Sequence, residues 1–116
     1  MREYEKIRTA IIRGGTSKGV YLLESDLPAD PSIRDQVIMS IYGTPDARQI
    51  NGLGGADPLT SKVALIKRSS NPDADVDYTF GYVGIADAHI DYSGNCGNIS
   101  SGVGPFAIDE GLVPAV

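Results

Sequence analysis

The sequence predicts a single domain of mixed α/β (α+β) class, and three observations lead to this prediction. A chain of 116 residues is long enough for one hydrophobic core. Several runs rich in β-branched and aromatic residues are separated by glycine, proline and asparagine, as strands are by turns. Two further segments carry apolar residues at the spacing of an amphipathic helix. Strands and helices combined in this way are typical of a sheet with helices packed on it.

The first predicted element is a β-hairpin. Two β-rich runs, at 7–12 and 19–24, flank the sequence GGTSKG at 14–19. Glycine allows the backbone conformations that tight turns need, so this segment is predicted to be an elaborated turn. Such a turn would present hydroxyl groups and backbone N–H groups to a ligand.

An amphipathic helix is predicted over 33–43. Asp30 and Pro31 come directly before it, and they are typical of a helix start, whereas Gly43 is typical of a helix end. The apolar positions on one helical face are Ile33, Val37, Ile38 and Ile41. This face is expected to be buried against the sheet.

The remainder of the chain combines a polar loop, three strands and a helix. The segment 48–62 (RQINGLGGADPLTSK) is too rich in turn residues for a helix or strand, and too long for a simple connection, which predicts a functional loop. Strands are predicted over 62–68, 76–86 and 88–93. The last helix is predicted over 98–110, because its apolar spacing suits burial of one side and a glycine follows it.

The composition argues against several classes of function. Ten Lys and Arg residues against 15 Asp and Glu give a net charge of −5, whereas nucleic acids and anionic membranes require a basic surface. No run approaches the roughly 20 apolar residues of a membrane span or resembles a signal peptide. Neither the phosphate-binding Walker loop nor the dinucleotide-binding glycine pattern matches the sequence. We therefore expect a cytoplasmic protein that binds neither nucleic acid nor membrane.

Three glycine-flanked polar clusters are candidates for ligand binding. They lie at 14–19 (GGTSKG), 52–62 (GLGGADPLTSK) and 94–98 (GNCGN). Glycine lets a ligand approach the backbone, and hydroxyl and N–H groups in such loops can bind carboxylate or phosphate oxygens. A tight turn without a ligand is an equally good interpretation of any one of them.

The only cysteine, Cys96, lies in the third cluster, just before the last predicted helix. A structural cysteine packs among apolar residues, whereas a reactive one needs access and a field that favours the thiolate. A helix N-terminus lowers the pKa of a thiol and binds anions. The Cys96 thiol could therefore exchange a proton at carbon while the backbone N–H groups of Gly97 and Asn98 hold a substrate carboxylate. The alternative is a loop cysteine without a role.

Lys62 is the second candidate for chemistry. It shares a strand face with Ala64 and Ile66, so it is expected to be partly buried where the strand begins. A partly desolvated lysine can act as a base or, in its protonated form, stabilise an enediolate. The alternative is an ordinary lysine at a strand edge. His89 is predicted to be a surface residue, and no cluster with metal-ligand spacing is found in the sequence.

Four motifs together resemble the PrpF-type family, which contains 2-methylaconitate cis–trans isomerase, 3-methylitaconate Δ-isomerase and 4-oxalomesaconate tautomerase. They are RGGTSKG, RQINGLGGADPLTSK, DADVDYTF and GNCGNISSGVGPFAIDEGLV, and they extend in order over nearly the whole chain. The resemblance implies a diaminopimelate-epimerase-like fold, in which two similar domains flank the active site. Each domain is a curved, mostly antiparallel sheet wrapped around a central helix, here 98–110. Residues 1–116 are then expected to form the N-terminal domain or part of it, without the second domain of the family.

The resemblance also implies a reaction and its residues. Family members move a proton between carbons of small unsaturated di- or tricarboxylates without a metal or a coenzyme. The family's acid/base lysine and cysteine correspond to Lys62 and Cys96. The residues that correspond to the loops around the substrate are Thr16, Ser17, Ser61, Gly97 and Asn98. The expected cofactor is none, and the 116-residue segment alone is expected to be inactive because part of the cleft is missing.

Two other functions remain open at this point. One is a non-catalytic carboxylate-binding accessory protein for a partner dehydratase, which would use the same loops for recognition only. The other is an amino-acid epimerase, although such enzymes commonly use a cysteine pair across two domains. A homodimer, a functional pairing with an aconitase-like dehydratase and a place in propionate metabolism are further expectations from the resemblance.

Overall fold

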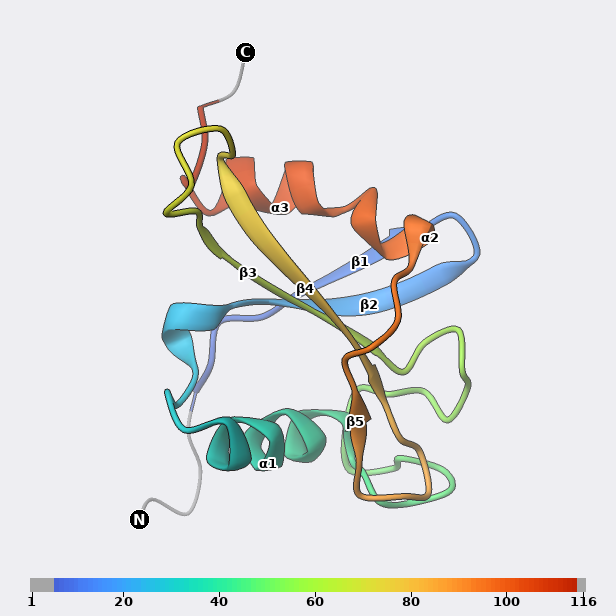
Figure 1. Cartoon of the computed structure of the whole chain (residues 1–116). Helices are drawn as coiled ribbons and strands as arrows, with labels where there is room; N and C mark the ends of the chain where they lie inside the picture. Colours follow the sequence, from blue (N-terminus) through green and yellow to red (C-terminus); the bar gives the residue numbers. More distant parts are fainter. Residues whose placement is uncertain (1–5, 115–116) are drawn as a thin grey trace.

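The computed structural model describes residues 6–114 and contains one mixed five-stranded sheet with helices on both faces (Figure 1). The strand order is β1-β2-β3-β4-β5; β2 and β3 are parallel, and every other neighbouring pair is antiparallel. This confirms the predicted mixed α/β class with a mostly antiparallel sheet. The strands are β1 (Ala10–Gly14), β2 (Ser17–Leu23), β3 (Lys62–Arg68), β4 (Val76–Val83) and β5 (Ile90–Asp91).

Helix α1 (Pro31–Tyr42) follows β2 and a short 3-10 turn, η1 (Glu24–Asp26). The carboxylate of Asp30 caps the helix by accepting a hydrogen bond from the Ser32 N–H at 2.9 Å, and Gly43 ends it in the left-handed conformation. The predicted helix is thus confirmed, with its start two residues earlier.

The buried face of α1 differs from the predicted one at its first position. Ile33 is 50% exposed, whereas Ile38 and Tyr42 are fully buried. Positions 38 and 42 share one side of a helix, and position 33 lies on a different side. Tyr42 was not part of the predicted apolar face, although it is fully buried.

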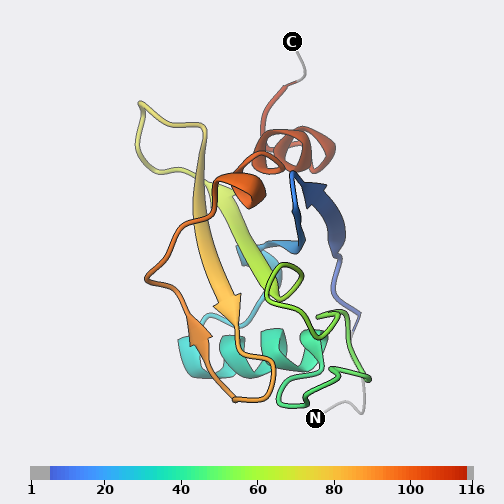
Figure 2. The same cartoon turned by 90° about the vertical axis from the view of Figure 1, so that its right-hand side faces the viewer.

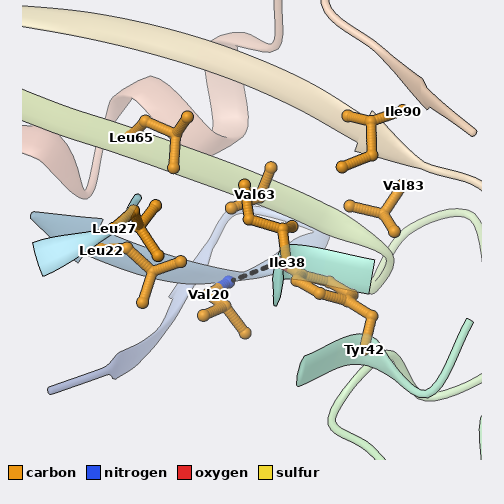
Figure 3. Packing of buried hydrophobic residues seen from close by; sticks show 9 residues of the cluster. All are labelled: Val20, Leu22, Leu27, Ile38, Tyr42, Val63, Leu65, Val83 and Ile90. Atoms are coloured by element: carbon orange, nitrogen blue, oxygen red, sulfur yellow. Dashed lines mark hydrogen bonds between the residues drawn. The ribbon is translucent and has the colours of Figure 1, made fainter. Parts of the chain in front are cut away.

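The first hydrophobic core lies between α1 and the sheet (Figure 3). The Tyr42 hydroxyl accepts a hydrogen bond from the Val20 N–H at 3.2 Å and donates one to the Lys62 carbonyl. Tyr42 therefore connects α1 to β2 and to the first residue of β3. The buried members of this core are Val20, Leu22, Leu27, Ile38, Tyr42, Val63, Leu65, Val83 and Ile90.

The second core lies on the opposite face, beneath helices α2 (Gly97–Ser100) and α3 (Val103–Asp109) (Figure 1). Alternate residues of β2 and β3 reach this face, so both strands are buried on both sides, as is typical of parallel strands. Burial, together with the nearby Cys96, raises the pKa of Tyr78 to about 12, and the Tyr78 hydroxyl has no hydrogen-bond partner within residues 6–114. The buried members are Tyr21, Ala64, Ile66, Ile99 and Phe106.

The predicted last helix is interrupted, and the central helix 98–110 is therefore replaced by α2 and α3. Pro105 has no N–H to donate to the carbonyl of residue 101, and its ring would collide with that carbonyl in a continuous helix. Gly102 lies at the break, where a Cβ atom would be 2.4 Å from the Tyr21 hydroxyl oxygen. A change of direction at this glycine lets both short helices pack on the sheet.

Two other predicted boundaries are also corrected. The hairpin strands extend into 14–19, leaving only Gly15 and Thr16 as the turn, because Gly14 pairs with Ser17 and Gly15 has a φ of 54°. The predicted strands 76–86 and 88–93 are shortened to β4 and β5. The Gly84 N–H donates to the His89 carbonyl at 2.8 Å, so the residues between them form a turn.

Candidate active site

Three polar side chains meet where β2 and β3 begin. The Lys62 ammonium donates to the Ser17 hydroxyl, with Nζ 2.8 Å from Oγ, and lies 3.6 Å from Cys96 Sγ. Ser17 Oγ is 4.0 Å from the same sulfur. Because β2 and β3 are parallel, their first residues lie at the same end of the sheet. We call Ser17, Lys62 and Cys96 the thiol cluster.

The strand alternation and the connection after β5 bring these residues together. Lys62 is half-buried and lies on the same face as Ala64 and Ile66, as predicted. Ser17 is 1% exposed at the start of β2. Figure 2 shows the chain after β5 passing along β4 to reach α2, and this path brings Cys96 over the start of β3.

The groups around Cys96 lower the pKa of its thiol. Partial burial by itself raises this pKa, but it is outweighed by the Ile99 N–H, the Lys62 ammonium and the Ser17 hydroxyl, which together favour the thiolate. The sequence prediction attributed such a shift to the N-terminus of the helix that follows Cys96. Cys96 is the N-cap of α2, and the Ile99 N–H that favours the thiolate belongs to this four-residue helix; the contribution of Lys62 adds to it.

We expect alkylation of Cys96 by iodoacetamide to reach half its maximal rate below the pH of about 8.5 that is usual for a free thiol. Lys62→Met should raise this midpoint, because it removes the ammonium beside the sulfur. Lys67→Met is the matched control, since Lys67 lies on the same strand but pairs with Glu24 at 3.3 Å. A wild-type midpoint at or above that of a free thiol would contradict the prediction.

The hairpin turn supports the segment that carries Cys96. The Asn98 side-chain amide donates to the Thr16 hydroxyl, with Nδ2 3.1 Å from Oγ1. A Cβ atom on Gly14 would lie 1.8 Å from the Asn98 carbonyl oxygen, so only glycine allows this approach. Thr16, Gly97 and Asn98 are exposed, and a Cβ atom on Gly97 would meet no atom within 4 Å. These three residues therefore form an open rim next to Cys96.

Gly14→Ala is expected to displace α2 and to destabilise the fold by about 1–3 kcal/mol, as overpacking does. It should also raise the pKa of Cys96, because the Ile99 N–H and the sulfur would move apart. Thermal unfolding and the alkylation midpoint measure the two effects. Gly104→Ala is the control, since a Cβ atom there meets nothing within 4 Å. Equal stability of the two variants would show that α2 does not depend on this contact.

Comparison with known proteins places this arrangement in a family. The family profile described as PrpF protein matches residues 4–116. The chain belongs to the PrpF family. It is similar to 3-methylitaconate isomerase of Eubacterium barkeri, with 63% identity over 116 residues, which cover 100% of this chain and 30% of that protein. It is also similar to 4-oxalomesaconate tautomerase of Pseudomonas putida, with 57% identity over 110 residues, covering 95% of this chain and 30% of that protein.

A solved structure supports the fold of this PrpF-family chain. The crystal structure of a methylitaconate-delta-isomerase superposes with a TM-score of 0.92 and 65% sequence identity, covering 95% of this chain and 28% of that one. The predicted family and fold class are thereby confirmed. The chain spans less than a third of the length of the relatives it matches.

Ser61 is the one predicted site residue of this PrpF-family chain that the structure does not bring to the thiol cluster or its rim. Its side chain is fully buried, and its hydroxyl donates to the Val83 carbonyl at 2.7 Å. Adjacent strand residues point to opposite faces, so Ser61 points away from the face that carries Lys62. Its contacts give Ser61 a structural role, and contact between Ser61 and a substrate stays a prediction.

A buried side chain within the loop 48–62, that of Gln49, holds the loop through hydrogen bonds, and this residue was not predicted from the sequence. Gln49 is 2% exposed and donates to the Ser61 hydroxyl at 3.0 Å. No pattern in the sequence distinguishes it from a surface glutamine. The length of the loop is explained in part by the chain that surrounds this side chain, and a functional role of the loop stays a prediction.

Over the described range, 6–114, no three or more His, Cys, Asp or Glu side chains are grouped so that they could hold a metal ion. His89 is exposed, as predicted. Within the same range, no helix has both the length and the apolar character needed to cross a membrane.

Proposed function

We propose that the protein containing this chain is an isomerase, which moves a proton between carbons of a small unsaturated di- or tricarboxylate by acid/base catalysis without a coenzyme. The observation that supports it is the 3.6 Å separation of Cys96 Sγ and Lys62 Nζ. A thiolate next to an ammonium provides a base, an acid and a positive charge within one site. A purely structural cysteine has no need of this arrangement.

In the proposed reaction, the Cys96 thiolate removes a proton from the carbon next to the double bond. The C–H bond breaks, an S–H bond forms, and the electron pair delocalises over three carbons and the adjacent carboxylate. The Lys62 ammonium stabilises the developing enediolate charge. Return of a proton to the other end of the three-carbon unit moves the double bond, and rotation in the delocalised intermediate changes cis to trans geometry.

The rim of the thiol cluster is proposed to bind a substrate carboxylate. Thr16, Gly97 and Asn98 offer a hydroxyl group, an open backbone approach and a side-chain amide next to the sulfur. Because the chain has a net charge of −5, attraction of an anionic substrate must come from such local donors and from Lys62. Ser17 supports Lys62 directly and is proposed to lie beneath the substrate.

The names of the similar proteins support the substrate class, since they refer to methylitaconate and oxalomesaconate. A cytoplasmic location, a homodimer and a place beside a dehydratase in propionate metabolism complete the proposal. The net negative charge is compatible with a soluble location.

Incubation of the intact protein with methylaconitate, methylitaconate and oxalomesaconate in deuterated water tests the proposal. NMR should show isomer formation with deuterium at a former allylic carbon, although return of the abstracted proton can delay its exchange. A chelator should leave the rate unchanged, because the Cys96 thiolate and the Lys62 ammonium provide the base and the positive charge that the proposed reaction needs. Binding of these acids without conversion of any of them would favour the carboxylate-binding accessory protein.

A further inference from the structure

We infer that Gln49 is a positioning residue for Lys62: its buried amide holds the start of β3 in the place from which the ammonium reaches Cys96. The catalytic consequence of this inference rests on the proposed function. Its structural part rests on hydrogen bonds that connect Gln49 to the residue before Lys62.

Every hydrogen-bonding group of the Gln49 amide is used. Nε2 donates to Ser61 Oγ at 3.0 Å and to Thr44 Oγ1 at 3.1 Å, and Oε1 accepts from the Ala56 N–H at 2.7 Å. The side chain thus joins the residue before β3, the residue after Gly43 and the middle of the loop. A buried polar group needs such partners, because an unsatisfied one costs free energy.

The directions of these hydrogen bonds require an amide. The Ser61 hydroxyl gives its only proton to the Val83 carbonyl at 2.7 Å, and the Thr44 hydroxyl gives its proton to the Gly84 carbonyl. Both hydroxyl oxygens can therefore only accept from residue 49. A carboxylate at this position could not donate to either of them, and an apolar side chain could bond to neither.

The surrounding backbone is shaped around this side chain. Gln49 has a φ of 45°, in the left-handed region that non-glycine residues rarely adopt. A Cβ atom on Gly54 would lie 2.3 Å from the Gln49 amide, so a glycine is required where the loop passes over it. A strained backbone conformation is retained only where its surroundings stabilise it, and the three hydrogen bonds of the Gln49 side chain stabilise it here.

Backbone hydrogen bonds next to this network reach the two strands that carry Ser17 and Lys62. The Val83 N–H donates to the Ser61 carbonyl at 2.9 Å, which fixes β4 against the start of β3. The Lys18 N–H donates to the Leu59 carbonyl at 2.9 Å, which attaches the loop next to Ser17. Loss of the Gln49 amide would leave these two backbone hydrogen bonds without the amide's own contacts with Ser61, Thr44 and Ala56, so the start of β3 would be held less firmly. The ammonium of Lys62 would then hold a less fixed position, and its effect on the thiol would weaken.

The test compares Gln49→Met and Gln49→Glu with the wild type in the intact protein. Met matches the length of Gln without its hydrogen bonds, and Glu matches its shape without its donors. Alkylation is measured by mass spectrometry of the Cys96 peptide. Both substitutions should raise the pH midpoint of Cys96 alkylation and slow alkylation at pH 7 by about threefold or more. In the proposed reaction, kcat should fall by a similar factor, with little change in KM.

Leu27→Ala is the matched control for lost stability, because Leu27 lies in the first core and makes none of these hydrogen bonds. It should lower the melting temperature and leave the alkylation midpoint unchanged. If the folded Gln49 variants also keep the wild-type midpoint, Gln49 is only structural and the inference is overturned. If the wild type converts no carboxylate, the proposed function fails, but the alkylation midpoint still decides the role of Gln49.

Discussion

Cys96→Ala in the intact protein is expected to lower turnover of the proposed unsaturated carboxylate substrate by about 10²–10⁴-fold, the usual contribution of a positioned acid or base. The variant removes the sulfur that lies 3.6 Å from the Lys62 ammonium and leaves no other thiol in this chain. Cys96 is only half-buried, so the fold should be retained. Steady-state kinetics and thermal unfolding measure the two effects separately.

Two further variants complete this experiment: Cys96→Ser is the conservative substitution, and Ser93→Ala is the control. Serine keeps a hydroxyl of similar size, but a hydroxyl is a much weaker acid than a thiol, so turnover should stay low near neutral pH. Ser93 lies in the same connecting segment and bonds to Asp91 at 2.6 Å, so its loss should leave turnover unchanged. Wild-type turnover in Cys96→Ala would make Cys96 a loop cysteine without a catalytic role.

Lys62→Met is expected to lower turnover by a similar factor of about 10²–10⁴. Methionine retains an unbranched apolar side chain but removes the ammonium, and with it the hydrogen bond to Ser17 at 2.8 Å. Two effects then act together. The enediolate loses its nearest positive charge, and the Cys96 thiolate becomes less populated near neutral pH.

Lys62→Arg separates these two effects. A guanidinium keeps the positive charge that favours the thiolate, but its planar shape differs from that of an ammonium. Alkylation of Cys96 should therefore stay close to wild type, while turnover stays low. Lys67→Met serves again as the control on the same strand. Full turnover in Lys62→Met would show that Lys62 is an ordinary lysine at a strand edge, without a catalytic role.

The elements set by local pattern were predictable from the sequence. The continuous apolar run within 62–68 predicts β3, and the place of Lys62 at the start of that run predicts its half-buried position, because both follow from the local sequence. Asp30 and Gly43 predict the ends of α1, because both act through the backbone next to them. The pairing of Lys62 with Cys96 was predicted from the resemblance to the PrpF family, which implies that both residues act in one reaction.

Other features depend on contacts that are distant in the sequence. The break between α2 and α3 has a local signal in Pro105, but the need for Gly102 comes from Tyr21 on β2. The different positions of Ser61 and Ser17 depend on which sheet face each one occupies. Gln49 could not be distinguished at all, because its partners lie on the loop, after α1 and before β3.

The most direct measurement compares two pH profiles of the intact protein: kcat/KM for the converted carboxylate, and the alkylation rate of Cys96. If the thiolate is the base, kcat/KM rises with pH through the same midpoint as alkylation, below about 8.5, because both require the deprotonated thiol. In Lys62→Arg and Gln49→Met, the two midpoints should stay equal to one another. A kcat/KM that is constant across the alkylation midpoint would contradict the account, since the group that titrates there would then not take part in the reaction.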